Sequence, residues 1–212
     1  MKNIDVPRET HRQVDALYSS SEVVFNDVAD RWLWWNKSIN IFSPGFKKSD
    51  VLQHIHHSLY VFPFLPGSNI DCFDVGTGGG LPGVPLAIAD PGRRYHLVDK
   101  VQKKMIVLKN ILSAFSICNA QSIHSNVHKL TFERAPCVVS KYAFKIDNLL
   151  EMLSGQRIHS YILLKGEDVF DELAAIPLQD YHVSSFHIGS SGIDFYRGKY
   201  VITIIPKQNH NL

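Results

Sequence analysis

The N-terminal third of the chain has apolar residues at helical spacing. The main stripe consists of Val24, Val28, Trp32 and Trp35. This spacing of three or four residues predicts an amphipathic helix that buries one face. Ser19 followed by Glu22 predicts a capping box at its start, and Pro44 predicts a break after its end. A second helix is expected over residues 50–60.

From residue 70 onward, short apolar runs alternate with segments of helical spacing. The runs that indicate strands cover residues 70–75, 95–98, 120–123, 137–139 and 161–164. This alternation predicts an α/β fold whose mostly parallel sheet is covered by helices on both faces. Two later runs, 183–188 and 200–205, flank a glycine- and serine-rich turn and predict a C-terminal antiparallel hairpin. We therefore expect an N-terminal helical extension over residues 1–66 and a sheet domain over residues 67–212.

Composition narrows the class of protein without identifying it. Of the 212 residues, 45% are hydrophobic and 20% are charged, which excludes collagen-like and disordered chains. No apolar run approaches the ~20 residues that span a bilayer, and residues 1–13 are too polar for a signal peptide. The three cysteines form no C-x-x-C pair, so a disulfide framework is not expected. We expect a cytoplasmic monomer that does not contact a membrane.

The glycine-rich segment 74–83 (DVGTGGGLPG) is the most specific motif of the chain. Glycines after a strand permit a tight turn and let backbone N–H groups approach a ligand. Residues 78–83 match the dinucleotide pattern G-x-G-x-x-G, which leaves an NAD-dependent oxidoreductase open. However, Asp74 could receive a positively charged amino group, and Asp99 after the next strand could accept ribose hydroxyls. S-adenosylmethionine carries both groups, so we expect it as the cofactor.

Several motifs carry a resemblance to one known family. They are DVGTGGGLPGVPLA at 74–87, WNKSIN at 35–40, HIHHSL at 54–59, LVD at 97–99 with the lysine pair at 103–104, VSK at 139–141 and LKG at 164–166. The glycine loop resembles that of the bacterial small-subunit ribosomal RNA guanine-N7 methyltransferases, also called glucose-inhibited division protein B. The other motifs are individually modest, but they follow the order of that family from about residue 24 to 205.

The resemblance implies a class I Rossmann-like methyltransferase that uses S-adenosylmethionine to methylate N7 of one guanine in 16S ribosomal RNA. The cofactor-binding residues expected from the loop and the resemblance are Asp74, Gly76, Thr77, Gly78, Gly80, Leu81, Asp99, Val127, His128 and Lys141. Three residues depart from the family: His57 replaces aspartate, His128 replaces a common glutamate, and Lys141 replaces arginine. These departures leave open a non-catalytic, ribosome-associated RNA-binding module.

The implied reaction requires little side-chain chemistry. N7 of guanine has an exposed lone pair and no proton, so no general base is needed and orientation of the reactants matters most. The absence of a Ser–His–acid or paired-carboxylate motif suits this reaction. Asn36 and Asn40 are candidates for polar positioning, although helix capping explains them equally well. Lys141 and Lys165 complete the catalytic candidates.

Basic and aromatic residues supply candidate contacts to ribosomal RNA or the small ribosomal subunit. The residues expected to bind RNA are Lys103, Lys104, Lys165 and Arg197. Lys165 follows a strand at the edge where ligands of α/β sheets bind. Trp34 points away from the apolar stripe and is a candidate for stacking on bases. His54, His56 and His57 have no completing acid or cysteine at a suitable spacing, so no metal site is expected.

Overall fold

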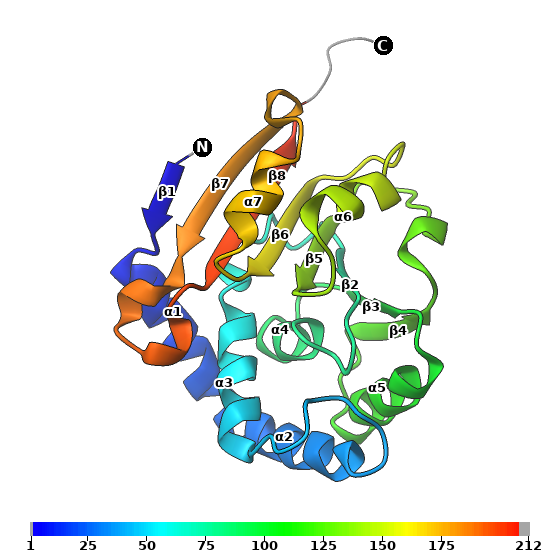
Figure 1. Cartoon of the computed structure of the whole chain (residues 1–212). Coiled ribbons are helices and arrows are strands. Elements are labelled where there is room, and N and C mark those ends of the chain that lie inside the picture. Colours follow the sequence, from blue (N-terminus) through cyan, green and yellow to red (C-terminus); the bar gives the residue numbers. More distant parts are fainter. Residues whose placement is uncertain (1, 208–212) are drawn as a thin grey trace.

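The computed structural model describes residues 2–207, which form one sheet flanked by helices (Figure 1). Its strands are β1 (Lys2–Asp5), β2 (Cys72–Val75), β3 (Tyr95–Asp99), β4 (Ala120–His124), β5 (Cys137–Lys141), β6 (Ser160–Lys165), β7 (Tyr181–His187) and β8 (Tyr200–Pro206). Their spatial order is β1-β7-β8-β6-β5-β2-β3-β4. Strands β2 to β6 pair in parallel, whereas β8 pairs antiparallel with both β6 and β7. The predicted parallel sheet with a C-terminal antiparallel hairpin is confirmed.

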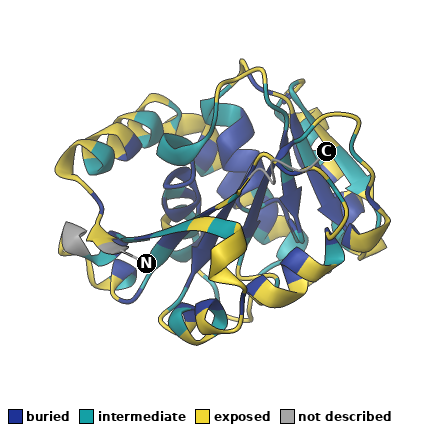
Figure 2. Cartoon of the chain, turned by 90° about the horizontal axis from the view of Figure 1, so that it is seen from above, coloured by how far each residue is buried: buried dark blue, intermediate teal, exposed yellow. Residues whose placement is uncertain are grey.

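Helices cover both faces of the sheet, as predicted. One face carries α1 (Arg8–Ser20), α2 (Glu22–Asn36), α3 (Lys48–Leu59), α4 (Gly83–Ala89) and α5 (Gln102–Ala114), and the other carries α6 (Ile146–Met152) and α7 (Val169–Ala174). Short 3-10 turns lie at η1 (Phe62–Phe64), η2 (Val127–Lys129), η3 (Leu178–Asp180), η4 (Ile188–Ser191) and η5 (Asp194–Tyr196). Figure 2 shows buried strands between helices whose outer surfaces are exposed. Each face of the sheet therefore has its own hydrophobic cluster.

The N-terminal strand β1 was not predicted from the sequence. It pairs in parallel with the edge of β7, so that Ile4 lies opposite Phe186 and Asp5 opposite His187. Backbone pairing holds this strand, and Ile4 stays exposed, so the segment lacks the alternating apolar pattern that marks a half-buried strand. Residues 2–5 therefore belong to the sheet and not to a helical segment.

The predicted capping box is wrong. Helix α1 continues to Ser20, which places Ser19 in its last turn, and α2 begins at Glu22 without a side-chain hydrogen bond from its N-cap residue. Both helices are held by burial, because Val14 of α1 and Phe25 of α2 lie in the same hydrophobic cluster. Burial of the apolar faces, and not a side-chain cap, therefore stabilises these two helices.

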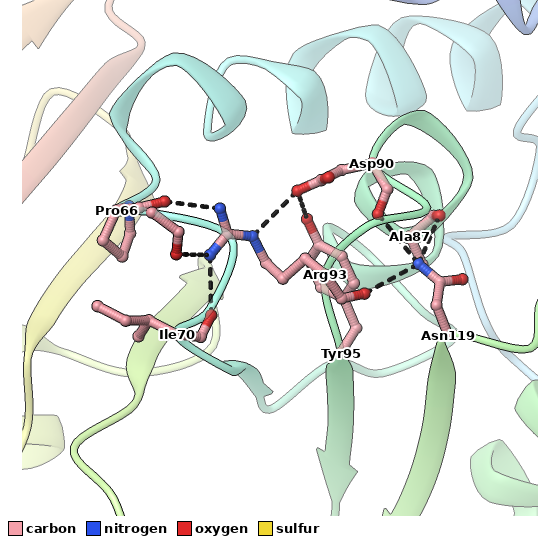
Figure 3. Close-up of polar contacts among 8 residues, drawn as sticks. Pro66, Ile70, Ala87, Asp90, Arg93, Tyr95 and Asn119 are labelled. Atoms are coloured by element: carbon pink, nitrogen blue, oxygen red, sulfur yellow. Dashed lines mark hydrogen bonds and ion pairs between the residues drawn. The ribbon is translucent and has the colours of Figure 1, made fainter.

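The junction at residues 66–70 is fixed by a buried arginine, which the sequence shows only as half of a basic pair. Arg93 is 4% exposed, and its guanidinium donates hydrogen bonds to the carbonyls of Pro66 (2.7 Å), Gly67 (3.0 Å) and Ile70 (2.8 Å) (Figure 3). Its Nε also pairs with Asp90 at 3.0 Å. The division of the chain near residue 66 stays a prediction, but hydrogen bonds from Arg93 connect the segments on its two sides.

Candidate active site

A cleft of about 740 Å³ opens at the carboxyl ends of β2, β3 and β5. The segments that line it lie within residues 41–46, 76–81, 99–104, 125–128 and 141–144, with His54 and Met152 at its sides. The carboxyl ends of parallel strands form the usual ligand-binding edge of an α/β sheet. The volume falls in the range of pockets that hold small molecules and cofactors, roughly 300–1,000 Å³.

The glycine loop between β2 and α4 forms the floor of this cleft. Gly76 has φ +70° and Gly78 has φ +60°, a region that favours glycine. A Cβ on Gly76 would lie 2.5 Å from Cβ of Ala143 and 2.8 Å from Phe144, so the loop passes close beneath the segment after β5. On its other side, Trp32 of α2 donates a hydrogen bond from Nε1 to the Gly79 carbonyl at 2.9 Å.

Asp99 at the end of β3 joins the loop to the next strand. Its Oδ2 accepts a hydrogen bond from the backbone N–H of Gly78 at 2.8 Å, and its Oδ1 accepts one from that of Val101 at 2.9 Å. The side chain also faces the cleft. A carboxylate has about four lone-pair positions, so these two bonds leave acceptor capacity for a ligand.

Asp74 at the end of β2 lies beneath the glycine loop and does not line the cleft. Its Oδ2 accepts hydrogen bonds from the Thr77 hydroxyl (2.6 Å) and the Gly83 N–H (2.8 Å). Its Oδ1 is buried and has no hydrogen-bond partner in the described part of the chain. Burial raises the pKa of Asp74 to about 7. The carboxyl group thus braces the loop and retains one unused buried acceptor.

Lys141 at the end of β5 lines the cleft and is anchored to α3. Its ammonium donates to the His54 carbonyl at 3.0 Å and lies 3.0 Å from Nδ1 of the same residue. Burial lowers the pKa of Lys141 to about 7, and burial together with Lys141 lowers the pKa of His54 to about 4. The neighbouring His57 is fully buried with both ring nitrogens unpartnered among the described residues, and burial holds its pKa well below the usual value. Lys141, His54 and His57 therefore carry less positive charge near neutral pH than exposed lysine and histidine side chains would.

The two asparagines do not lie in the cleft. Asn36 ends α2, and its Oδ1 accepts hydrogen bonds from the N–H groups of Ile41 (2.8 Å) and Phe42 (2.9 Å). It thereby folds the loop that supplies one wall of the cleft, which corrects its expected catalytic role to a positioning role. Asn40 is exposed on the same loop and does not line the cleft, so its expected catalytic contact is also not placed there.

Lys165 is not available to RNA in the way its position at a strand end predicts. It is 5% exposed, and its Nζ pairs with Glu172 of α7 at 2.6 Å and donates to the Phe144 carbonyl at 2.5 Å. These bonds fix the segment after β5 against α7. Lys165 therefore forms a buried structural ion pair with Glu172 and does not line the cleft. This placement corrects its expected phosphate contact and catalytic role.

The remaining basic candidates differ in exposure. Lys104 is half-buried and lines the cleft, whereas Lys103 is exposed on α5 just outside it. Arg197 is exposed on the segment between β7 and β8 and pairs with Asp194 at 3.1 Å. Because β8 runs antiparallel to β6, this segment lies at the same edge of the sheet as the cleft.

Most of the expected cofactor residues are brought together. Those that line the cleft are Gly76, Thr77, Gly78, Leu81, Asp99, Val127, His128 and Lys141. The expected residues that lie beneath its surface are Asp74 and Gly80. Their contacts with a cofactor stay predictions.

Sequence reasoning missed an aromatic wall of the cleft. Phe42 and Phe46 stack with ring centroids 5.5 Å apart and an interplanar angle of 8°, and Phe46 stacks on His54 at 5.5 Å and 11°. All three line the cleft. The phenylalanines lie in an irregular loop, so no periodicity marks them, and the stack exists only because this loop packs against α3.

Two features are absent from the part of the chain that the structure describes. None of its helices is long and apolar enough to cross a membrane. Within the same range, no group of three histidine, cysteine, aspartate or glutamate side chains is placed to hold a metal ion.

Known proteins resemble this chain in fold. The structure of Pyrococcus abyssi tRNA (uracil-54, C5)-methyltransferase in complex with S-adenosyl-L-homocysteine matches with a TM-score of 0.55 and 11% identity, covering 76% of this chain and 40% of that one. The structure of M. capricolum TrmK in complex with S-adenosyl-homocysteine matches with a TM-score of 0.52 and 18% identity, covering 73% of this chain and 70% of that one. Both support the Rossmann-like methyltransferase fold.

Sequence comparisons are more specific. The protein called ribosomal RNA small subunit methyltransferase G in Christiangramia forsetii is 31% identical over 196 residues, which cover 86% of this chain and 89% of that protein. Its namesake in Chlorobium limicola is 38% identical over 118 residues, an alignment that spans 54% of this chain and about half (53%) of the relative. The sequence model of the GidB family, described as rRNA small subunit methyltransferase G, matches residues 24–187. This chain therefore belongs to the GidB family of rRNA small subunit methyltransferases.

Proposed function

We propose that this protein transfers a methyl group from S-adenosylmethionine to N7 of a guanine in bacterial small-subunit ribosomal RNA. One observation carries the proposal: the glycine loop, Asp99 and a wall of stacked aromatic rings meet in a single cleft. The names of the relatives favour a methyltransferase over the NAD-dependent oxidoreductase and the non-catalytic module.

The residues present fit S-adenosylmethionine. Gly76 and Gly78 keep the loop free of Cβ atoms where a ligand would approach, and Asp99 faces the cleft with spare acceptor capacity for ribose hydroxyls. Val127 and His128 line the neighbouring wall and are the candidates for contact with the adenine. When bound, this cofactor supplies a methyl group made electrophilic by its sulfonium centre.

The side chains around the cleft suit a reaction that needs no general base. The acceptor nitrogen becomes positively charged as it is methylated, so a nearby fixed cation would oppose the reaction. The pKa of Lys141 is about 7 and that of His54 about 4, so His54 is neutral and Lys141 is partly neutral at physiological pH. The aromatic rings of Phe42 and Phe46 can hold a base by stacking and exclude water from it.

We further propose that residues 1–66 complete the methyltransferase domain of residues 67–212. The aromatic wall and the cap from Asn36 both come from this N-terminal extension. Substrate recognition would then depend on the extension, while cofactor binding would depend on the sheet domain. We expect the protein to act as a cytoplasmic monomer on ribosomal RNA, either free or within the small subunit.

Calorimetry with S-adenosylmethionine tests the cofactor half of the proposal. A cofactor ammonium near the loop should lower the pKa of Asp74 from about 7, so binding should release a proton at about pH 7. Titrations in two buffers of different ionisation enthalpy measure that proton, and Asp74→Asn should abolish its release. NAD serves as the control ligand and should not bind. Absence of S-adenosylmethionine binding would refute the proposal.

Methyl transfer tests the other half. Tritiated S-adenosylmethionine is incubated with the protein and small-subunit RNA from a bacterium that lacks this methyltransferase, either deproteinised or within intact subunits. We expect label in one guanine, identified as N7-methylguanine by strand cleavage at the modified base. Label at another atom, or on protein, would contradict the assignment.

A further inference from the structure

Trp34 on the outer face of α2 presents a large aromatic surface that the core does not use. It is 55% exposed, in contrast to the fully buried Trp32. The guanidinium carbon of Arg31, one turn earlier on the helix, lies 5.3 Å from the centroid of the Trp34 ring. Arginine over tryptophan is a favourable cation–π pair, and both groups also stack on nucleic-acid bases.

Asn110 of α5 anchors Arg31 directly and Trp34 only through the neighbouring Trp35. Its Oδ1 accepts a hydrogen bond from Nε of Arg31 and another from Nε1 of Trp35, each at 3.0 Å. The Trp35 ring in turn packs edge-on to Trp34 at 5.0 Å. The terminal guanidinium nitrogens of Arg31 have no acceptor within residues 2–207 and remain available to a phosphate. A surface aromatic that is fixed in this way loses little conformational entropy when it binds a partner.

The surface around Trp34 continues to the cleft along α5. Lys103 and Ile106 share the helix face of Asn110, at positions i−7 and i−4. Both are exposed, Ile106 by 51%, and the adjacent Lys104 lines the cleft. Seven helical residues span roughly 10 Å, about the rise of three stacked nucleotides.

We propose that Arg31 and Trp34, fixed by Asn110, form a stacking platform for an unpaired base of the ribosomal RNA strand that flanks the target guanine. The proposal rests on the proposed function, because it places the flanking strand by the cleft that would hold the target. Charge favours RNA over a protein partner: Arg31, Lys103 and Lys104 mark a basic path between the platform and the cleft. Asp27, one helical turn before Arg31 on α2, is also exposed.

Binding of bacterial small-subunit ribosomal RNA, stripped of protein, to the full chain tests the platform. Trp34→Ala should weaken the affinity by about tenfold or more, because stacking on an aromatic ring contributes that much per base. Trp34→Phe should retain most of the affinity, whereas Trp34→Leu, which is apolar but has no π face, should not. Val23→Ala is the matched control, since Val23 is 76% exposed on the same helix face but roughly 16 Å away. It should bind RNA like the unchanged protein.

Further measurements separate the platform from the function of the cleft. Affinity for S-adenosylmethionine should be unchanged in the Trp34 variants, and KM for RNA should rise while kcat changes little. If the unchanged protein methylates RNA but Trp34→Ala binds RNA normally, the platform is refuted and the function stands. If Trp34→Ala weakens binding only to intact small subunits, the partner is a protein and the proposal is overturned. If the unchanged protein binds the RNA without methylating it, the function fails, and the comparison of Trp34→Phe with Trp34→Leu still decides on the platform.

Discussion

Two glycines of the cofactor loop provide a matched test of how the cleft is built. Gly76 and Gly78 have nearly equal φ values, +70° and +60°, so alanine at either position must adopt a left-handed conformation. That conformation costs about 1–2 kcal/mol for an L-residue. The space around them differs. A Cβ at Gly76 would lie 2.5 Å from Ala143, whereas a Cβ at Gly78 meets only the flexible end of Lys104, at 3.8 Å.

The expected costs follow from this difference. Gly78→Ala should lower the free energy of unfolding by about 1–2 kcal/mol, from backbone strain alone. Gly76→Ala adds overpacking, which costs a further ~1–3 kcal/mol, so its total should reach about 2–5 kcal/mol. Because Ala143 and Phe144 line the cleft, Gly76→Ala should also displace that wall and weaken cofactor binding.

Urea denaturation of the cofactor-free variants, followed by tryptophan fluorescence, measures these free energies. The dependence on urea concentration should stay that of the unchanged protein, so that shifts in midpoint report stability. Equal destabilisation by the two variants would refute the close approach of the loop to the segment after β5. A larger effect of Gly78→Ala would show that backbone strain, and not crowding, dominates this loop.

Three further predictions concern charged groups. Burial raises the pKa of Asp74 to about 7, so the folded protein keeps a proton that the unfolded chain loses above about pH 4. The free energy of unfolding without cofactor should therefore fall as the pH rises towards 7, by roughly 4 kcal/mol once Asp74 is fully ionised, and Asp74→Asn should flatten this slope in urea titrations. Lys165→Met leaves the largely buried Glu172 carboxylate with only the Ile146 N–H as a partner and should lower the free energy of unfolding by about 3–5 kcal/mol; an unchanged urea midpoint would contradict the ion pair. Lys103→Ala and Arg197→Ala should each reduce the slope of log affinity for RNA against log salt by about 0.7, and unchanged slopes would exclude phosphate contacts.

Local constraints made part of this molecule predictable from its sequence. The glycine loop was recognisable because a turn with positive φ at Gly76 and Gly78 accepts few other residues. The alternation of strands and helices was recognisable because buried strands are short apolar runs, whereas the helices between them have apolar residues at a spacing of three or four. Asp99 was predictable as a residue at the ligand-binding edge because it ends β3, the strand that follows the glycine loop.

Long-range packing decided what the sequence could not show. Lys165 has a strand-end position that suits a ligand contact, but its partner Glu172 lies on α7, and only the folded chain brings them together. Likewise, β1 is held by the backbone of β7, which leaves no side-chain pattern to read. Asn36 was expected at the catalytic site, but its bonds to the N–H groups of the following loop place it outside the cleft, where it shapes one wall.

The guanidinium of Arg93 donates hydrogen bonds to three carbonyl groups in the segment that connects the N-terminal helices to β2. Three hydrogen bonds oppose bending of this connection, so we expect the helices beside the aromatic wall to keep their position against the cofactor loop. Under the proposed function, an RNA strand would then have to adapt to a preformed entrance to the cleft.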